Sequence, residues 1–357
     1  MKYQTDDLRI IEMKEVSTPT QVFEEFPLSE ESSSCVHHAR KEIQEVFHGE
    51  DDRLVVVVGP CSIHDPEAAR DYANRLLEQR NKWSTDLLII MRVYFEKPRT
   101  TVGWKGLIND PNLDDSFEIN KGLRLARELL LDLNNMGIPA GTEYLDLVSP
   151  QYVADLVSWG AIGARTTESQ VHRELASGLS CPVGFKNATD GGLQVAVDAI
   201  GSATRPHHFL SVTKEGKSAI FSTAGNPDCH VILRGGKSTN YDKTSIEEAC
   251  ASLEKAGLSP RVMVDCSHAN SLKKHDNQKD VGTDICNQLS AGEQRIFGIM
   301  IESNIVEGRQ NVVNGKAETY GQSVTDACIN WKDTEQLLEQ FAKAVQARRL
   351  AKDNAAA

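Results

Sequence analysis

The 357-residue sequence has no apolar run long enough to cross a membrane, and its first residues lack the apolar core that a signal peptide requires. It also lacks an excess of positive charge, because 51 Asp and Glu outnumber 39 Lys and Arg and give a formal net charge of −12. This balance argues against a nucleic-acid or anionic-membrane partner, although small anions can still bind a local cluster of Arg and Lys. We therefore expect a cytoplasmic protein with no nucleic-acid and no membrane partner.

The cysteines show neither CxxC pairs nor short regular spacing, which argues against a disulfide framework and against a zinc knuckle. There are eight of them: Cys35, Cys61, Cys181, Cys229, Cys250, Cys266, Cys286 and Cys328. Most are expected to be small buried apolar residues. Only Cys61 lies where chemistry could use it, directly after a predicted strand.

What the sequence does contain is a repeated unit in which a buried strand ends in polar residues and a helix follows. The clearest copy is the stretch Leu54–His64, whose β-branched run is apolar on both faces and predicts a strand covered on both sides by helices. The run stops at Gly59-Pro60. Asp65-Pro66-Glu67 then supplies a capping side chain, a proline at the first helical position and an acid in the first turn, so a helix begins there.

The same unit recurs along the chain and predicts a closed (β/α)8 barrel, an α/β TIM-barrel fold. Strands are expected at residues 54–60, 87–95, 139–145, 161–166, 182–187, 231–234, 262–268 and 297–302. Helices are expected at residues 66–80, 117–135, 150–160, 167–177, 190–200, 245–256, 283–291 and 333–349. Ser149-Pro150, Thr167 with Gln170, and Asp190 are the predicted starts of the third, fourth and fifth helices. A doubly wound open sheet is the alternative, but no GxGxxG follows the first strand.

Two further strand-like runs, 209–213 and 218–223, are joined by only four residues, so they are expected to form an antiparallel hairpin. The predicted organisation is an N-terminal regulatory or oligomerisation extension (1–50), a catalytic barrel (51–350) with an inserted hairpin (207–224), and a short tail (351–357). Within the extension, residues 34–47 predict one amphipathic helix.

Each predicted barrel strand ends in an ionisable side chain, and active sites of such barrels lie at this end of the strands. In chain order the side chains are Cys61, Arg92, Glu143, Arg165, Lys186, Arg234, His268 and Glu302. A solvated charge would explain any one of them, but chance would leave several strand ends without an ionisable residue. We therefore expect one shared site.

The cations of this set would repel one another unless an anion lies between them. They are Arg92, Arg165, Lys186 and Arg234, joined by Lys97 and Arg99 from the long loop after the second strand. Guanidinium groups suit phosphate and carboxylate geometry, which indicates a substrate that carries both. Pairing with the protein's own acids is the alternative for any single member.

Cys61, His268 and Glu302 come from the first, seventh and eighth strands, which are neighbours where the barrel closes. Asp326, after the eighth strand, can fold back over them. Sulfur, nitrogen and oxygen donors suit Mn²⁺, Fe²⁺, Co²⁺ or Zn²⁺, although a lone Cys or His is more often part of a core. Because a lone histidine is more often structural than a ligand, five histidines are expected to be structural: His64, His172, His207, His208 and His230.

Six long segments closely resemble the type I, feedback-regulated microbial 3-deoxy-D-arabino-heptulosonate-7-phosphate (DAHP) synthases. They are GPCSIH (59–64), MRVYFEKPRTTVGWKGL (91–107), GARTTESQ (163–170), PVGFKN (182–187), ILRGGK (232–237) and DCSHAN (265–270). The resemblance spans nearly the whole chain. It implies a transferase of the shikimate pathway to chorismate and the aromatic amino acids, which condenses phosphoenolpyruvate with erythrose 4-phosphate on a divalent metal and releases phosphate.

The resemblance also implies roles for individual residues. The metal ligands would be Cys61, His268, Glu302 and Asp326. The phosphoenolpyruvate contacts would be Arg92, Lys97, Glu143, Arg165, Lys186 and Arg234. The turn of Lys97, Pro98, Arg99 and Thr100 would hold erythrose 4-phosphate, and Gly163 and Ala164 complete the substrate-binding set. Lys97 and Lys186 would be the candidate proton donors. Together with the metal ligands Cys61 and His268 they would form the catalytic set.

Similar enzymes bind an aromatic amino acid as feedback inhibitor and assemble as homodimers or homotetramers. The matching effector positions are Asp6, Asp7, Ile10, Asp146, Pro150, Gln151, Ser180, Phe209, Ser211 and Phe221. Asp146 or Asp7 would pair with the ligand's ammonium group. Ser211 favours phenylalanine over tyrosine, whereas Phe221 is larger than the residue expected there.

Two alternatives remain at this point. The sister synthase that makes 3-deoxy-manno-octulosonate 8-phosphate shares the barrel and the chemistry, but it usually lacks the long N-terminal arm and reads differently at the Lys-Pro-Arg-Thr loop. A non-catalytic barrel that senses phosphate or an amino acid would not need the intact ligand set.

Overall fold

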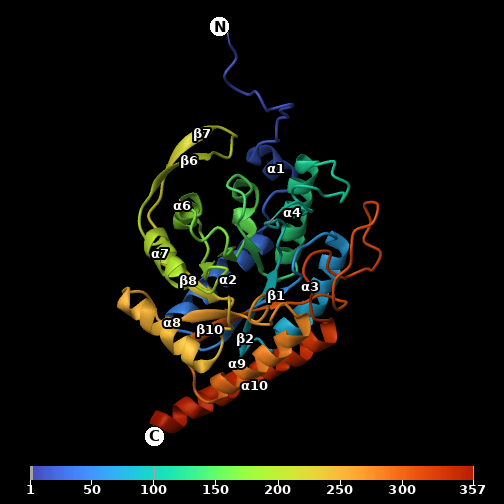
Figure 1. The fold of residues 1–357 in the computed structure, drawn as a ribbon. Helices are drawn as coiled ribbons and strands as arrows, with labels where there is room; N and C mark the ends of the chain where they lie inside the picture. The colour runs from blue at the N-terminus through green and yellow to red at the C-terminus, as the bar shows by residue number, and fades with distance from the viewer. Residues whose placement is uncertain (1–2, 100, 357) are drawn as a thin grey trace.

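Eight parallel strands close into a barrel in the computed structural model, which describes residues 3–99 and 101–356, with side chains to residue 352 (Figure 1). Around the barrel the strands run in the order β1-β10-β9-β8-β5-β4-β3-β2. Because β1 pairs with both β2 and β10, the sheet has no free edge, which confirms the (β/α)8 barrel and excludes the open sheet. Their bounds are β1 (Leu54–Gly59), β2 (Leu87–Arg92), β3 (Ala140–Glu143), β4 (Trp159–Ile162), β5 (Val183–Lys186), β8 (Cys229–Leu233), β9 (Val262–Asp265) and β10 (Ile296–Glu302).

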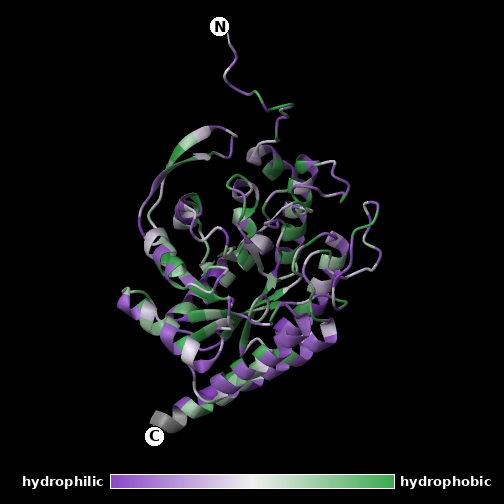
Figure 2. Cartoon of the chain, viewed as in Figure 1, coloured by the Kyte–Doolittle hydropathy of each residue, from purple (hydrophilic) through white to green (hydrophobic). Residues whose placement is uncertain are grey.

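Helices follow the strands and form the outer layer. They are α3 (Pro66–Lys82), α4 (Ile119–Asn135), α5 (Pro150–Val153), α6 (Gln170–Gly178), α7 (Gln194–Ala203), α8 (Lys243–Lys255), α9 (Gln278–Ser290) and α10 (Trp331–Ala356), with 3-10 turns η1 (Ala154–Leu156) and η2 (His275–Asn277). Both faces of β1 are buried as predicted, since Val55 and Val57 face the barrel interior while Leu54, Val56 and Val58 pack under the helices. Figure 2 shows hydrophilic residues along the outer side of α10. Within the described residues, no helix is long and apolar enough to span a membrane.

Helix α2 (Glu30–His48) belongs to the N-terminal extension and closes the end of the barrel opposite the strand C-termini. Its residues Ile43, Val46 and Phe47 join the same buried cluster as Trp159 and Phe297 inside the barrel. The helix confirms the predicted amphipathic segment and is longer at its start, where Ser29 caps it. A shorter helix, α1 (Pro19–Glu25), was not predicted, although Thr18 and Gln21 form a capping box there. The chain before α1 extends away from the barrel (Figure 1).

The inserted hairpin is present as predicted, with β6 (His208–Val212) paired antiparallel to β7 (Ser218–Ser222). Its turn lies against α1, because the backbone oxygen of Lys214 accepts hydrogen bonds from the backbone N–H and the hydroxyl of Thr20, both at 2.9 Å. Leu210 and Ile220 lie opposite each other on the exposed face of the hairpin.

Four predicted helix boundaries are wrong, two of them because nearby groups outcompete the expected caps. The helix expected to end at Gly160 is four residues long, and Gly160 lies inside β4. Thr167 donates to the backbone oxygens of Gly163 and Lys186 instead of capping, so α6 begins at Gln170. Asp190 accepts from the N–H of Gly192 within a turn, so α7 begins at Gln194. Helix α9 begins at Gln278, five residues before the predicted start.

Candidate active site

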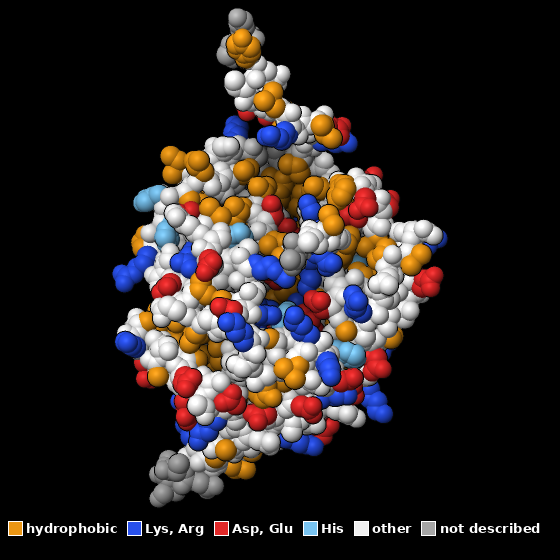
Figure 3. Space-filling model, viewed as in Figure 1, with side chains coloured by type: hydrophobic (Ala, Val, Ile, Leu, Met, Phe, Trp, Pro, Cys, Tyr) orange, Lys and Arg blue, Asp and Glu red, His pale blue; other side chains and the backbone are white. Residues whose placement is uncertain are grey.

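The C-terminal ends of the strands bring most of the predicted substrate contacts to one cavity of about 320 Å³. Its lining includes Arg92, Lys97, Pro98, Arg99, Glu143, Gly163, Ala164, Arg165, Lys186, Arg234, His268 and Asp326. Thr100 lies outside the described residues. Figure 3 shows Lys and Arg side chains gathered around a hollow near the centre of this face. The predicted concentration of positive charge is therefore present at the barrel mouth.

Arg92 is the most firmly held of these cations. Its guanidinium donates to the backbone oxygens of Pro60 at 3.0 Å and Cys61 at 3.2 Å and to the Glu302 carboxylate at 2.9 Å. It also lies 3.6 Å from the centre of the Tyr94 ring. Burial opposes the charge, but Tyr94 and Glu302 outweigh burial and raise the pKa of Arg92. Arg92 thus ties the end of β2 to the ends of β1 and β10.

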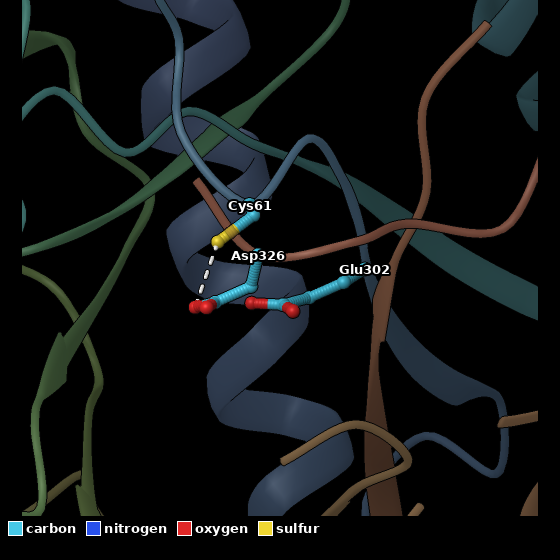
Figure 4. Close-up of side chains that lie close together, drawn as sticks. All are labelled: Cys61, Glu302 and Asp326. Atoms are coloured by element: carbon cyan, nitrogen blue, oxygen red, sulfur yellow. Dashed lines mark hydrogen bonds between the residues drawn. The ribbon is translucent and has the colours of Figure 1, made fainter. Parts of the chain in front are cut away.

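Three predicted metal ligands lie together beside this cavity (Figure 4). Donor atoms of Cys61, Glu302 and Asp326 all lie within 4.8 Å of one another. The Cys61 thiol donates to the Asp326 carboxylate at 3.3 Å and accepts from the Lys97 ammonium at 3.0 Å. Thiol and carboxylate donors so close together fit a divalent cation of intermediate softness.

The protonation of this cluster follows from burial and from the nearby charges. Burial, and then the charge of Glu302, raise the pKa of Cys61 to about 11. Burial also opposes ionisation of Glu302, but the charges of His268 and Arg92 outweigh it and lower the pKa of Glu302. Desolvation is likewise outweighed at Asp326, where the Lys97 ammonium and the Cys61 thiol lower the pKa to about 2. The two acids are therefore ready to bind a cation, whereas the thiol must lose a proton first.

His268, the fourth predicted ligand, lies next to the cluster. Its Nε2 is 3.9 Å from Oε1 of Glu302, and its Nδ1 is 2.8 Å from Oδ2 of Asp265. The backbone of His268 is left-handed, with φ of 56°, a conformation that non-glycine residues rarely adopt and that often marks functional sites. One imidazole nitrogen therefore faces the cluster while the other contacts a carboxylate.

Asp265 is a candidate functional residue that the sequence did not single out. It accepts from the Lys186 ammonium at 2.9 Å and from the backbone N–H of Ser267 at 2.9 Å, in addition to its contact with His268. Burial opposes its charge, but His268 and Lys186 hold the pKa of Asp265 well below its usual range. A carboxylate at the end of an otherwise apolar strand was the available signal. Asp265 links the candidate metal site to the cation cavity.

Glu143 and Gly163 meet in the wall of the cavity. Oε1 of Glu143 is buried and has no hydrogen-bond partner among the described residues. A Cβ atom on Gly163 would lie 2.4 Å from this oxygen, so any side chain here would displace the Glu143 carboxylate. The carboxylate is left with an acceptor available to a bound molecule.

Known proteins match this chain over nearly its full length. The model of the DAHP synthetase I family matches residues 25–339. The chain belongs to this family. A phospho-2-dehydro-3-deoxyheptonate aldolase of Escherichia coli K12, named Phe-sensitive, is 61% identical over 98% of this chain and 100% of that protein. A Trp-sensitive enzyme of Salmonella typhi is 52% identical over 97% of this chain and 99% of that one. The solved enzyme of Francisella tularensis superposes with a TM-score of 0.93 at 58% identity, covering 95% of this chain and 99% of that chain.

The family assignment gives the activity. DAHP synthases condense phosphoenolpyruvate with erythrose 4-phosphate, the first step of the shikimate pathway, and this chain is a 3-deoxy-7-phosphoheptulonate synthase. The family is metal-dependent, and the cluster around Cys61 is a candidate site for the ion. High identity to DAHP synthases over nearly the full length favours this activity over the octulosonate synthase and over a non-catalytic barrel.

A separate cavity of about 1180 Å³ in the synthase brings together six of the ten predicted effector positions. They are Pro150, Gln151, Ser180, Phe209, Ser211 and Phe221. The other four lie elsewhere: Asp6, Asp7 and Ile10 are exposed on the N-terminal arm, and Asp146 accepts from the backbone N–H groups of Val148 and Ser149. Lys214 also lines the cavity and was not predicted. The hairpin, α2 and the segment after β3 thus share this cavity.

Proposed function

We propose that this chain condenses phosphoenolpyruvate with erythrose 4-phosphate at the mouth of its barrel. One observation carries the proposal: the donors of Cys61, Glu302 and Asp326, within 4.8 Å of one another, lie beside a cavity lined by cations. A Lewis acid next to an anion-binding cavity is what the condensation of an aldehyde with a phosphorylated enol requires.

Cys61, His268, Glu302 and Asp326 would hold a divalent cation, Mn²⁺, Fe²⁺, Co²⁺ or Zn²⁺. When bound, the ion supplies Lewis acidity that polarises the aldehyde oxygen of erythrose 4-phosphate. The Lys97 ammonium, 3.0 Å from the Cys61 sulfur, would favour the thiolate form that binds the ion. Asp265 would fix the ring of His268 through Nδ1.

The cations of the cavity would position the two substrates. Arg165, Lys186 and Arg234 would bind phosphoenolpyruvate, and Pro98 and Arg99 would bind the sugar phosphate. C3 of phosphoenolpyruvate then attacks the aldehyde carbon, water adds at C2, and phosphate leaves as its bond to C2 breaks. Lys97 and Lys186 are the candidate donors of protons to the new hydroxyl and to the leaving phosphate. Holding two polyanions in attack geometry lowers the barrier.

Release of phosphate from phosphoenolpyruvate and erythrose 4-phosphate tests this proposal. We expect activity with Mn²⁺, loss of activity with EDTA, and a large rise in the KM for phosphoenolpyruvate in Arg165→Ala. Arg205→Ala is the matched control, because Arg205 lines a different cavity near Phe47 and His230. Activity in EDTA, or unaltered kinetics in Arg165→Ala, would contradict the assignment of the site.

We further propose that the cavity lined by Phe209, Ser211 and Phe221 binds an aromatic amino acid, with phenylalanine preferred over tyrosine. The support is the meeting of the hairpin and the segment after β3 at one cavity, together with Ser211, whose side chain would crowd a phenol hydroxyl. Inhibition assays with Phe, Tyr and Trp decide the ligand. Ser211→Gly should increase sensitivity to Tyr, and no response to any of the three would remove the idea.

The extension (1–50) is proposed to serve regulation and assembly, as a homodimer or homotetramer in the cytoplasm. Leu8, Ile11 and Met13 are 66%, 102% and 79% exposed, so the arm offers apolar surface to a second copy. Asp6, Asp7 and Ile10 would then reach the effector cavity of that copy. Light scattering of the full chain and of a chain lacking residues 1–16 tests this, because equal masses and equal inhibition by phenylalanine would exclude it.

A further inference from the structure

A second cavity, of about 510 Å³, adjoins the first at the barrel mouth. The two cavities share Arg165, Thr189, Arg234, His268 and Asp326 in their walls. The second cavity then continues past Lys273 and Arg309, which do not line the first. Among the described residues of the sugar-phosphate loop (Lys97–Arg99), none lines the second cavity. Arg165 and Arg234 therefore lie between the two cavities.

The second cavity carries surplus positive charge. In the described part of the chain, the side chains of Lys273, Arg309 and Arg234 make no hydrogen bond and no ion pair. The acids in its wall, Glu302 and Asp326, belong to the candidate metal site. Unpaired ammonium and guanidinium groups that converge on one space suit a phosphate dianion.

Lys273 and Arg309 come from two different segments, and each backbone is fixed locally. Lys273 has a left-handed backbone with φ of 59°, and its N–H donates to the backbone oxygen of His268 at 2.8 Å. Arg309 lies in a β-bridge with Ser323 in the segment that also carries Asp326. The loops after β9 and β10 therefore each deliver one cation to the same cavity.

We propose that the second cavity is the release site for the phosphate product, a role that rests on the proposed function of the first cavity. When the bond between C2 and the phosphate oxygen breaks, the electron pair leaves with the phosphate, which is still held by Arg165 and Arg234. Because both arginines also line the second cavity, the anion can transfer to Lys273 and Arg309. It then leaves without passing the sugar chain on the side of Lys97–Arg99.

Product inhibition by inorganic phosphate tests the proposal, with phosphoenolpyruvate as the varied substrate. Phosphate in the first cavity competes with phosphoenolpyruvate, whereas phosphate in the second cavity binds beside it and inhibits noncompetitively. We expect a noncompetitive component in the wild type. Its inhibition constant should rise about tenfold in Lys273→Gln/Arg309→Gln, because two charge-assisted contacts are lost. Lys274→Gln/Arg205→Gln removes the same net charge from exposed positions outside the cavity and is the matched control.

Each alternative outcome overturns the proposal. Purely competitive inhibition of the wild type would leave the second cavity without a role in phosphate binding, as would an unchanged noncompetitive constant in the double variant. A raised KM for erythrose 4-phosphate in that variant would assign the cavity to the phosphate ester of the sugar. Calorimetric titration of inorganic phosphate into protein saturated with phosphoenolpyruvate measures phosphate binding to the second cavity without turnover. A wild type that releases no phosphate from its substrates would instead refute the proposed function itself.

Discussion

At the scale of single residues, Asp265 governs both halves of the candidate active site. It contacts Lys186 in the cation cavity and His268 beside the candidate metal cluster. Asp265→Asn would keep the size of the side chain but remove the charge that holds both partners. We expect metal affinity and kcat/KM to fall about 10- to 100-fold, as is usual when a carboxylate that orients a histidine ligand is lost.

Titration with Mn²⁺ and steady-state kinetics on the folded fraction measure these changes. Asp280→Asn on the exposed surface of α9 is the control. A variant with reduced kcat/KM and wild-type metal affinity would show that Asp265 acts on Lys186 alone.

The buried Glu96 carboxyl should make the stability of the fold depend on pH. Burial, and then the charge of Asp146, raise the pKa of Glu96 from 4.5 to about 7. Between these values the folded state holds a proton that the unfolded chain has released, so rising pH lowers the free energy of unfolding. Glu96→Gln has no such titration, so its free energy of unfolding does not fall in this way. The free energy of unfolding of the variant minus that of the wild type should therefore rise by about 1–3 kcal/mol from about pH 5 to about pH 8.

Urea unfolding of both proteins at the two pH values measures the difference. Glu248→Gln, at an exposed position of α8, should show no such dependence. A difference that shrinks with rising pH would mean that Glu96 is charged in the folded protein at low pH.

Residues at strand ends could be predicted from the sequence because the period of a buried strand and the parallel barrel together place them. Arg92, Lys186 and Glu302 lie at the barrel mouth for this reason. Only one ionisable residue was predicted for each strand end, and Asp265 was missed because it shares its strand end with His268. Thr167 was misjudged because a short hydroxyl side chain can bond to several nearby backbone groups, and only the folded chain decides which.

At the scale of elements, the hairpin is fastened to its surroundings through Lys214. Its ammonium bonds to the backbone oxygen of Gln151 and lies 4.9 Å from the centre of the Phe23 ring. Lys214→Ala would remove the ammonium contacts with α5 and with Phe23 of α1, would keep the backbone bonds to Thr20, and would loosen the proposed effector cavity. We expect the concentration of phenylalanine for half-inhibition to rise about tenfold, a loss of about 1.4 kcal/mol, with little change in the uninhibited rate.

Inhibition curves for this variant and for Lys217→Ala, an exposed lysine of the same turn, make the comparison. Equal inhibition of the two variants would place the effector elsewhere.

The hairpin and the helix after β3 show why some elements are predictable and others are not. Four residues between two β-rich runs exclude a crossover helix, so local spacing alone identified β6 and β7. Helix α5 was predicted too long, because the segment leaves the helix in order to pair: the N–H of Ser158 donates to the backbone oxygen of Ala140 in β3. Pairing with a distant strand overrides local helix preference.

At the scale of the whole molecule, closure of the barrel creates the candidate metal site. Gly59 in β1 pairs with Glu302 in β10, and the neighbouring Val58 pairs with Met91 in β2. Cys61 and Glu302, far apart in the sequence, are therefore neighbours. The sequence could predict this meeting from the number of strands, but it could not predict the second cavity, whose walls come mostly from irregular loops after β9 and β10.

The same closure makes bound metal a stabiliser of the whole fold, because the unfolded chain does not hold the donors together. A cation at about 100 times its dissociation constant adds about 2.7 kcal/mol to the stability of the folded state. Thermal unfolding should therefore occur at higher temperature with Mn²⁺ than with EDTA. His268→Ala should reduce this difference, whereas Glu307→Gln should not, although Glu307 lies in an exposed cluster with His275 and Asp276. Loss of the Mn²⁺ effect in Glu307→Gln, or its persistence at full size in His268→Ala, would show that the metal does not bind at the barrel mouth.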